Sequence, residues 1–393
     1  MIKPSANDFY DDKIAWGTTS EIAKFHQNKF EEFAAKPPQE IEEACRDEEG
    51  KLIHILRAEH FDLKFLEKIC ETANAARRIS KLEDNSLKGL LRGKSVLNYF
   101  EQPSSRTFNS FFSAEGRLGM QRGDLRDLDT SSHAKGESHR DALRTISSYY
   151  DAMVCRTKSD VFDLFALWVM KTSDREIPVI NAGSGKEEHP TQALLDYYTI
   201  RESFDGKLRN KVGVYVGDCL RGRTVHSLAK VMALHPGGTA YFVGPESLQV
   251  DEKTEKYLLE RGVSVHKVSD RSLEEIVPLG DYIYMTRVQN EHGGDGSYDP
   301  RFVFTLEMLD RMRDGAILMH PLPKREEIDP RIDYLSNNSS NPTERERAGK
   351  VMIWRQMRNG MWTRIALLSH VFGVDDQIRN HYSKIEKANS PKP

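Results

Sequence analysis

The sequence predicts an α/β protein made of two doubly wound parallel-sheet domains, with the active site in the cleft between them. Short apolar runs, typical of buried parallel strands, alternate with segments whose apolar residues recur at helical spacing. These runs form two series, and one helix that begins near Pro190 joins them. In addition, 393 residues are too many for one ordinary core, so two domains are expected.

The two series set the expected domain limits. The first domain is expected over 51–196 and the second over 197–350, and a closing helix at about 352–372 packs back on the first. Residues 1–50 are polar and charged, and we expect them to form an N-terminal extension, an appended arm outside the core. The last stretch, 384–393, is expected to be disordered.

Polar side chains follow nearly every expected strand. The strands are expected at 96–100, 152–155, 177–180, 212–216, 240–243, 265–268, 282–285 and 317–319. Because ligands of such sheets bind beyond the carboxyl ends of the strands, the residues that follow the strands are the candidate site.

Composition excludes several classes of function. The formal net charge of −3 excludes nucleic-acid binding through bulk electrostatics, so any basic site must be local. The N-terminus lacks an apolar signal region and no run reaches membrane-spanning length, so no membrane association is expected. The cysteines are far apart and form no C-x-x-C pair, which favours buried reduced thiols of a cytoplasmic protein over a zinc site. They are Cys45, Cys70, Cys155 and Cys219.

The stretch Ser104-Ser105-Arg106-Thr107 lies between the strand at 96–100 and a helix expected at 108–118. This order places backbone N–H groups at a helix N-terminus, where the unpaired donors and the helix dipole favour an anion. The hydroxyls and the guanidinium fork of Arg106 add further donors, so the natural ligand is a phosphate. The alternative is an ordinary Ser/Thr cap beside a surface arginine.

Basic residues also follow the other strands. Arg156, His189, Arg223 and Arg287 would bring three arginines and a histidine into one cleft with few carboxylates, which predicts a small, polyanionic pair of substrates. His189 alone could equally be a capping or core histidine. The segment 217–224 reads G-x-x-x-x-G-R-T and has arginine where a P-loop needs lysine, which argues against an NTPase.

Five motifs, in this order and spacing, resemble those of the transcarbamylase family over about residues 52–372. They are Ser104–Thr107, His189–Gln192, Gly222–Thr224, Thr286–Gln289 and His320–Pro323. The T-R-V-Q segment, and Pro321 where the ornithine branch usually has cysteine, are similar to the aspartate branch. The resemblance implies transfer of the carbamoyl group of carbamoyl phosphate to the α-amine of L-aspartate, giving N-carbamoyl-L-aspartate and phosphate for pyrimidine biosynthesis. Because the leaving group is good, no cofactor, metal or covalent nucleophile is implied.

The resemblance also implies a role for each residue. The phosphate would be held by Ser104, Ser105, Arg106 and Thr107. The carbonyl oxygen would accept hydrogen bonds from Thr107, Arg156 and neutral His189. The carbamoyl NH₂ would be positioned by Gln192 and the backbone carbonyl of Leu322. The carboxylates of aspartate would be held by Arg223, Arg287 and Gln289.

In the family, a loop similar to 129–138 reaches into the active site of a neighbouring subunit. Ser131 and Lys135 would then act on carbamoyl phosphate in trans, Lys135 would also contact aspartate, and the implied unit is a homotrimer with shared sites. The chain departs from the family pattern at Ala134, where a second lysine is common, and at His292, where the aspartate branch often has arginine. These departures keep open the alternative of a non-catalytic scaffold subunit. A second alternative is a transcarbamylase that acts on another amino acid. A regulatory chain is a further candidate partner.

Overall fold

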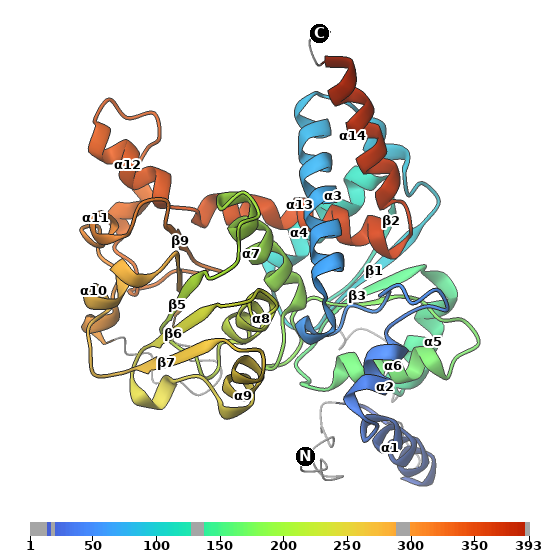
Figure 1. The fold of residues 1–393 in the computed structure, drawn as a ribbon. Coiled ribbons are helices and arrows are strands. Elements are labelled where there is room, and N and C mark those ends of the chain that lie inside the picture. The colour runs from blue at the N-terminus through green and yellow to red at the C-terminus, as the bar shows by residue number, and fades with distance from the viewer. Residues whose placement is uncertain (1–13, 17–19, 127–136, 288–298, 390–393) are drawn as a thin grey trace. The chain divides into compact units, whose positions relative to one another are not determined.

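The computed structural model describes residues 14–16, 20–126, 137–287 and 299–389. The chain forms two compact units, one made of 1–60, 64–191 and 361–393 and the other of 61–63 and 192–360. Each unit contains one parallel sheet with helices around it, as Figure 1 shows. The prediction of two parallel-sheet α/β domains is therefore confirmed.

The first unit holds a four-stranded sheet in the order β2–β1–β3–β4. Its strands are β1 (Ser95–Phe100), β2 (Gln121–Leu125), β3 (Ala152–Arg156) and β4 (Val179–Asn181). Its helices are α1 (Ser20–Ala34), α2 (Pro38–Ala44), α3 (Leu63–Lys81), α4 (Ser105–Leu118), α5 (His139–Tyr149), α6 (Phe162–Lys171), α14 (Asp375–Asn389) and the second half of α13 (Ile353–Val371). The sequence did not predict β2, because this edge strand reads Gln-Arg-Gly-Asp-Leu and is largely exposed.

The N-terminal segment differs from the expected appended arm. Phe30 of α1 is fully buried, and its ring lies 5.5 Å from Phe165 and 5.8 Å from Trp168, both on α6. Trp16 also packs edge-to-face on Phe165, with ring centroids 5.4 Å apart. Every residue of α6 from Phe162 to Met170 is buried, and all of them except Asp163 are apolar, so the helix needs cover on all sides and the N-terminal segment supplies part of it.

The C-terminal residues also differ from the prediction, because residues 384–389 belong to α14 and not to a disordered tail. In Figure 1, α14 runs beside α3, and Lys68 of α3 forms an ion pair of 2.9 Å with the buried Asp375. Burial alone would raise the pKa of Asp375, but the neighbouring basic side chains of His370, Lys68 and Arg379 outweigh it and hold this pKa far below its ordinary value. The sequence did not predict this part of α14, because its charged composition resembles that of a disordered tail. Ion pairs attach the helix to the core.

The second unit holds a five-stranded sheet in the order β7–β6–β5–β8–β9. Its strands are β5 (Val212–Val216), β6 (Thr239–Val243), β7 (Ser264–Val268), β8 (Tyr282–Met285) and β9 (Ile317–Met319). Its helices are α7 (Pro190–Ser203), α8 (Arg223–Met232), α9 (Glu252–Glu260), α10 (Leu273–Ile276), α11 (Met308–Arg311), α12 (Pro342–Lys350) and the first half of α13. Alternate residues of β5 face opposite sides, so Val214 packs in the core beside α10 while Tyr215 stacks on Phe242.

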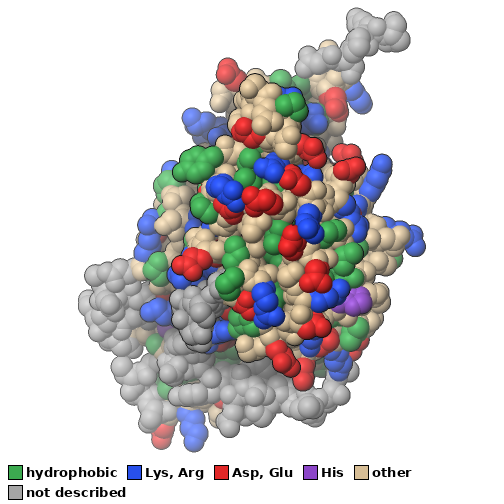
Figure 2. All heavy atoms as spheres, turned by 90° about the vertical axis from the view of Figure 1, so that its left-hand side faces the viewer, with side chains coloured by type: hydrophobic (Ala, Val, Ile, Leu, Met, Phe, Trp, Pro, Cys, Tyr) green, Lys and Arg blue, Asp and Glu red, His purple; other side chains and the backbone are tan. Residues whose placement is uncertain are grey.

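The exposed charges are mixed in sign. On the face shown in Figure 2, basic and acidic side chains are interspersed among the described atoms. No helix in the described part of the chain is long and apolar enough to cross a bilayer. The four cysteines are buried and unpaired by disulfides, as predicted.

Candidate active site

The start of α4 is the candidate anion site in the first unit. Ser104 is the N-cap residue, with φ −157° and ψ 95°, and among the described residues its side chain makes no capping hydrogen bond. Ser105 and Arg106 are exposed in the first turn, and Thr107 is buried behind them. The first-turn N–H groups are therefore not satisfied by their own cap, which removes the main support for the ordinary-cap alternative.

Arg156 and His189 meet beside a single glycine. Arg156 ends β3, opposite Phe100 of β1, and its Nη1 donates to the carbonyl of Ala182 over 3.1 Å. Gly183 has φ +98°, and a Cβ built on it would lie 2.7 Å from Nη1 of Arg156 and 2.9 Å from Nε2 of His189. Two buried N–H-bearing groups thus lie around one backbone position where only glycine fits.

The loop after β4 holds this arrangement, a role that was not expected from the sequence. The Asn181 carboxamide oxygen accepts hydrogen bonds of 2.8 Å from the N–H groups of both Gly183 and Ser184. The Ser184 hydroxyl in turn accepts from the N–H of Thr157, next to Arg156, over 3.0 Å. The strand-ending Asn-Ala-Gly-Ser-Gly was the available signal, because Asn followed by Gly and Ser is typical of a side-chain-stabilised turn.

In the second unit, the loops after β5 and β8 come together. Gly217 has φ +105°, and a Cβ on it would lie 2.2 Å from the carbonyl oxygen of Thr286. The Thr286 hydroxyl donates to the carbonyl of Val216 over 2.8 Å. The loop that leads to Arg223, the first residue of α8, therefore contacts the strand end that carries Arg287. Both arginines are half-buried.

The turn after β9 has an unusual backbone. Leu322 adopts φ +61°, which a leucine rarely does, and the Leu322–Pro323 peptide is cis. The Leu322 N–H donates to Nδ1 of His320 over 2.8 Å, which leaves the proton of the neutral ring on Nε2. Nε2 then donates to the Glu327 carboxylate over 2.8 Å, and both partners are 1% exposed. The position of the Leu322 carbonyl thus depends on a buried His–Glu pair.

Three predicted site residues, Ser131, Lys135 and Gln289, lie outside the described residues. The remaining ones fall into two sets. Ser104, Ser105, Arg106, Thr107, Arg156 and His189 belong to the first unit, and Gln192, Arg223, Arg287 and Leu322 belong to the second. The structure brings Arg156 and His189 into proximity and places the loops of Arg223 and Arg287 in contact.

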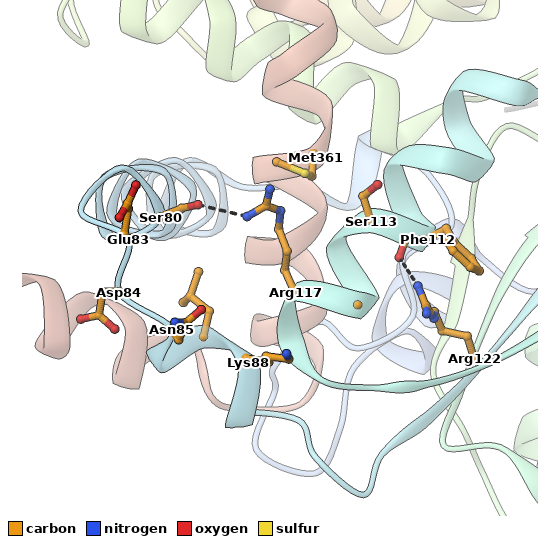
Figure 3. A pocket seen from close by; sticks show the side chains of 12 residues that line it. Ser80, Glu83, Asp84, Asn85, Lys88, Phe112, Ser113, Arg117, Arg122 and Met361 are labelled. Atoms are coloured by element: carbon orange, nitrogen blue, oxygen red, sulfur yellow. Dashed lines mark hydrogen bonds between the residues drawn. The ribbon is translucent and has the colours of Figure 1, made fainter.

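A separate pocket of about 740 Å³ lies at the other end of α4 (Figure 3). It is lined by residues of α3, α4, β2 and α13 and of the turn that follows α3, among them Lys88, Arg117 and Met361. None of the described candidate residues lines it. Arg117 there donates to the Ser80 hydroxyl over 3.0 Å.

Comparison with known proteins agrees with these motifs. The carbamoyl-P binding domain of aspartate/ornithine carbamoyltransferases matches residues 53–202, and the Asp/Orn binding domain matches residues 210–371. The aspartate carbamoyltransferase catalytic subunit of Chromobacterium violaceum is 35% identical over 81% of this chain and 97% of its own length. Aspartate carbamoyltransferase 1, chloroplastic, of Pisum sativum is 36% identical over 81% of this chain and 78% of its own. Over 82% of its length, the chain is also 37% identical to the multifunctional protein pyr1-3 of Dictyostelium discoideum, and the match covers 14% of that protein.

Solved structures give the same result. Aspartate transcarbamoylase from Trypanosoma cruzi in complex with N-(phosphonacetyl)-L-aspartic acid superposes with a TM-score of 0.69 at 30% identity, over 80% of this chain and 94% of that one. The same enzyme in complex with carbamoyl aspartate and phosphate gives a TM-score of 0.68 at 30% identity, over the same shares of the two chains. With both domains matched and the strand-end motifs in place, the chain belongs to the aspartate/ornithine carbamoyltransferase family.

Proposed function

We propose that the protein transfers the carbamoyl group of carbamoyl phosphate to the α-amine of L-aspartate, giving N-carbamoyl-L-aspartate and phosphate for pyrimidine biosynthesis. The observation that carries the proposal is the meeting of Arg156 and His189 at Gly183, beside the β1 end that leads into the uncapped start of α4. A phosphate at α4 would place the attached carbonyl within reach of donors that stabilise negative charge. The relatives that share both domains are named for this reaction.

In the proposed mechanism the protein aligns two anions and stabilises the charge that develops between them. Ser104, Ser105, Arg106 and Thr107 hold the phosphate. Thr107, Arg156 and His189 donate to the carbonyl oxygen as the α-amine attacks. The bond between the carbonyl carbon and the phosphate oxygen breaks, and the phosphate leaves with the bonding electrons and takes up the proton that the amine loses. Gln192 and the Leu322 carbonyl hold the carbamoyl NH₂, while Arg223, Arg287 and Gln289 hold the two carboxylates of aspartate. The transfer requires the groups of both units to reach the same pair of substrates.

The test is product formation with two acceptors. We expect carbamoyl-aspartate and phosphate from carbamoyl phosphate and L-aspartate, and no product with L-ornithine. Product with ornithine would mean that Arg223 and Arg287 do not select a dicarboxylate. Absence of product with both acceptors would favour the scaffold alternative.

We further propose a homotrimer in which Ser131 and Lys135 complete the site of a neighbouring subunit. Mixing inactive Arg106→Ala chains with inactive Lys135→Ala chains should then restore activity. Random 1:1 exchange in a cyclic trimer makes about one quarter of the sites intact, so about that share of wild-type activity is expected.

A matched control uses two residues of the same unit. Mixing Arg106→Ala with Arg156→Ala chains should restore nothing, because both groups belong to one chain's contribution to the site. If exchange is verified by a mass-tagged chain and the first mixture also stays inactive, the shared site is wrong.

We also propose a cytoplasmic location, which the reduced, buried cysteines support.

A further inference from the structure

We infer that Asp196 is a positioning residue that sets the preference of the acyl-phosphate site for an amino group. The inference rests on the proposed function, in which Gln192 and the Leu322 carbonyl hold the carbamoyl NH₂. Asp196 is fully buried on α7 and belongs to the second unit. The four residues through which it would act belong to the same unit, and they are Gln192, His320, Leu322 and Gln356. It lies four residues after Gln192, so the two side chains share one face of the helix.

The Asp196 carboxylate receives hydrogen bonds from three different elements. The Gln192 amide Nε2 donates to its Oδ1 over 3.0 Å, and the Gln356 amide Nε2, from α13, donates to the same oxygen over 2.6 Å. The Tyr284 hydroxyl, from β8, donates to Oδ2 over 2.6 Å. A carboxylate accepts and does not donate, so each amide must turn its NH₂ toward Asp196.

For Gln356, the partners of both the amide nitrogen and the amide oxygen require this orientation. Its oxygen accepts from the backbone N–H of His320 over 2.9 Å, and a backbone N–H can only donate. Since Gln356 is fully buried between an acceptor and a donor, only one amide orientation satisfies both. His320 then positions Leu322 through the Nδ1 hydrogen bond from the Leu322 N–H.

The Asp196 carboxylate also fixes the orientation of the Gln192 amide. With its NH₂ turned to Asp196, its carbonyl oxygen points away from the carboxylate and is an acceptor for a ligand. The second acceptor, the Leu322 carbonyl, is connected to the same carboxylate through His320 and Gln356. Two acceptors match an NH₂ group, which has two donors, and they offer nothing to a methyl group of similar size. An asparagine at 196 could donate, and it would allow Gln192 to present its NH₂ instead.

The experiment compares carbamoyl phosphate with acetyl phosphate, in which a methyl group replaces the NH₂. Carbamoyl-aspartate formation gives the KM for carbamoyl phosphate, and acetyl phosphate is measured as a competitive inhibitor. For Asp196→Asn we expect the KM to rise about tenfold, as for the loss of one or two neutral hydrogen bonds, with the inhibition constant of acetyl phosphate changed less than about twofold. The ratio of the KM for carbamoyl phosphate to the inhibition constant of acetyl phosphate should therefore rise. Gln356→Met should raise the same ratio, and it tests the proposal if the asparagine variant does not fold.

Thr199→Val is the matched control, because Thr199 accepts from Asn359 over 2.9 Å and so joins the same two helices one turn away. It should leave the ratio unchanged. Equal loss of affinity for both acyl phosphates in Asp196→Asn, or no loss for either, would make Asp196 a structural residue and overturn the inference. A wild-type chain that forms no carbamoyl-aspartate would refute the proposed function, which is a different result from an active chain with an unchanged ratio.

Discussion

Replacing Arg106 by alanine should lower carbamoyl-aspartate formation by at least 10²–10³-fold, the effect of removing a donor aimed at developing charge. The side chain is exposed in the first turn of α4, so its loss creates no cavity. An exposed substitution of this kind typically changes the free energy of unfolding by less than about 0.5 kcal/mol. We therefore expect the thermal unfolding midpoint to stay near the wild-type value while turnover is lost.

Arg117→Ala is the matched control for this prediction. Arg117 is an exposed arginine of the same helix, but it lies in the last turn, where Figure 3 shows it bonded to Ser80. It should retain activity. If Arg106→Ala instead lost its cooperative unfolding transition, or if both variants lost activity equally, Arg106 would not be the phosphate ligand.

Replacing Glu115 by glutamine should stabilise the protein above neutral pH. Glu115 is fully buried on α4, and its Oε2 accepts from the amide of Asn98 over 3.0 Å. Within the described residues, neither Oε1 of Glu115 nor Oδ1 of Asn98 has a hydrogen-bond partner. A protonated Glu115 could donate to that Oδ1 and satisfy both atoms, and glutamine would do the same at every pH.

The pH dependence follows from the pKa. Burial raises the pKa of Glu115 from 4.5 to about 7. A raised folded-state pKa contributes stability that is complete below pH 4.5 and is lost as the pH rises through about 7. At about 1.4 kcal/mol per pKa unit, the loss amounts to about 3 kcal/mol, so Glu115→Gln should be more stable than the wild type by up to that amount at pH 8.

Urea unfolding at several pH values measures this difference. The two proteins should have similar free energies of unfolding at pH 4.5 and diverge as the pH rises, since all other groups titrate alike in both. Parallel curves from pH 4.5 to 8 would show that Glu115 is ionised in the folded protein and would contradict the prediction.

The described strands other than β2 could be predicted, most of them because they are short apolar runs that are buried in the structure. β2 could not be predicted, since an exposed edge strand has no apolar signal. The candidate substrate-binding residues could be recognised because basic and hydroxyl side chains follow one strand after another. Of the groups that orient them, Asn181 left a local turn signal, whereas Asp196 acts through contacts between segments that the sequence does not place together. Asp196 follows Gln192 by one helical turn, but nothing in the sequence brings it to Gln356.

The packing of the N-terminal segment bears on how shortened versions of the protein would behave. The family match begins at residue 53, yet Phe30, Ala34 and Cys45 are already part of the buried interior. A chain cut at the start of the match would present the aromatic side of α6 to water, a surface of the kind that promotes self-association. The buried interior of the first unit therefore extends beyond the segment that matches the family.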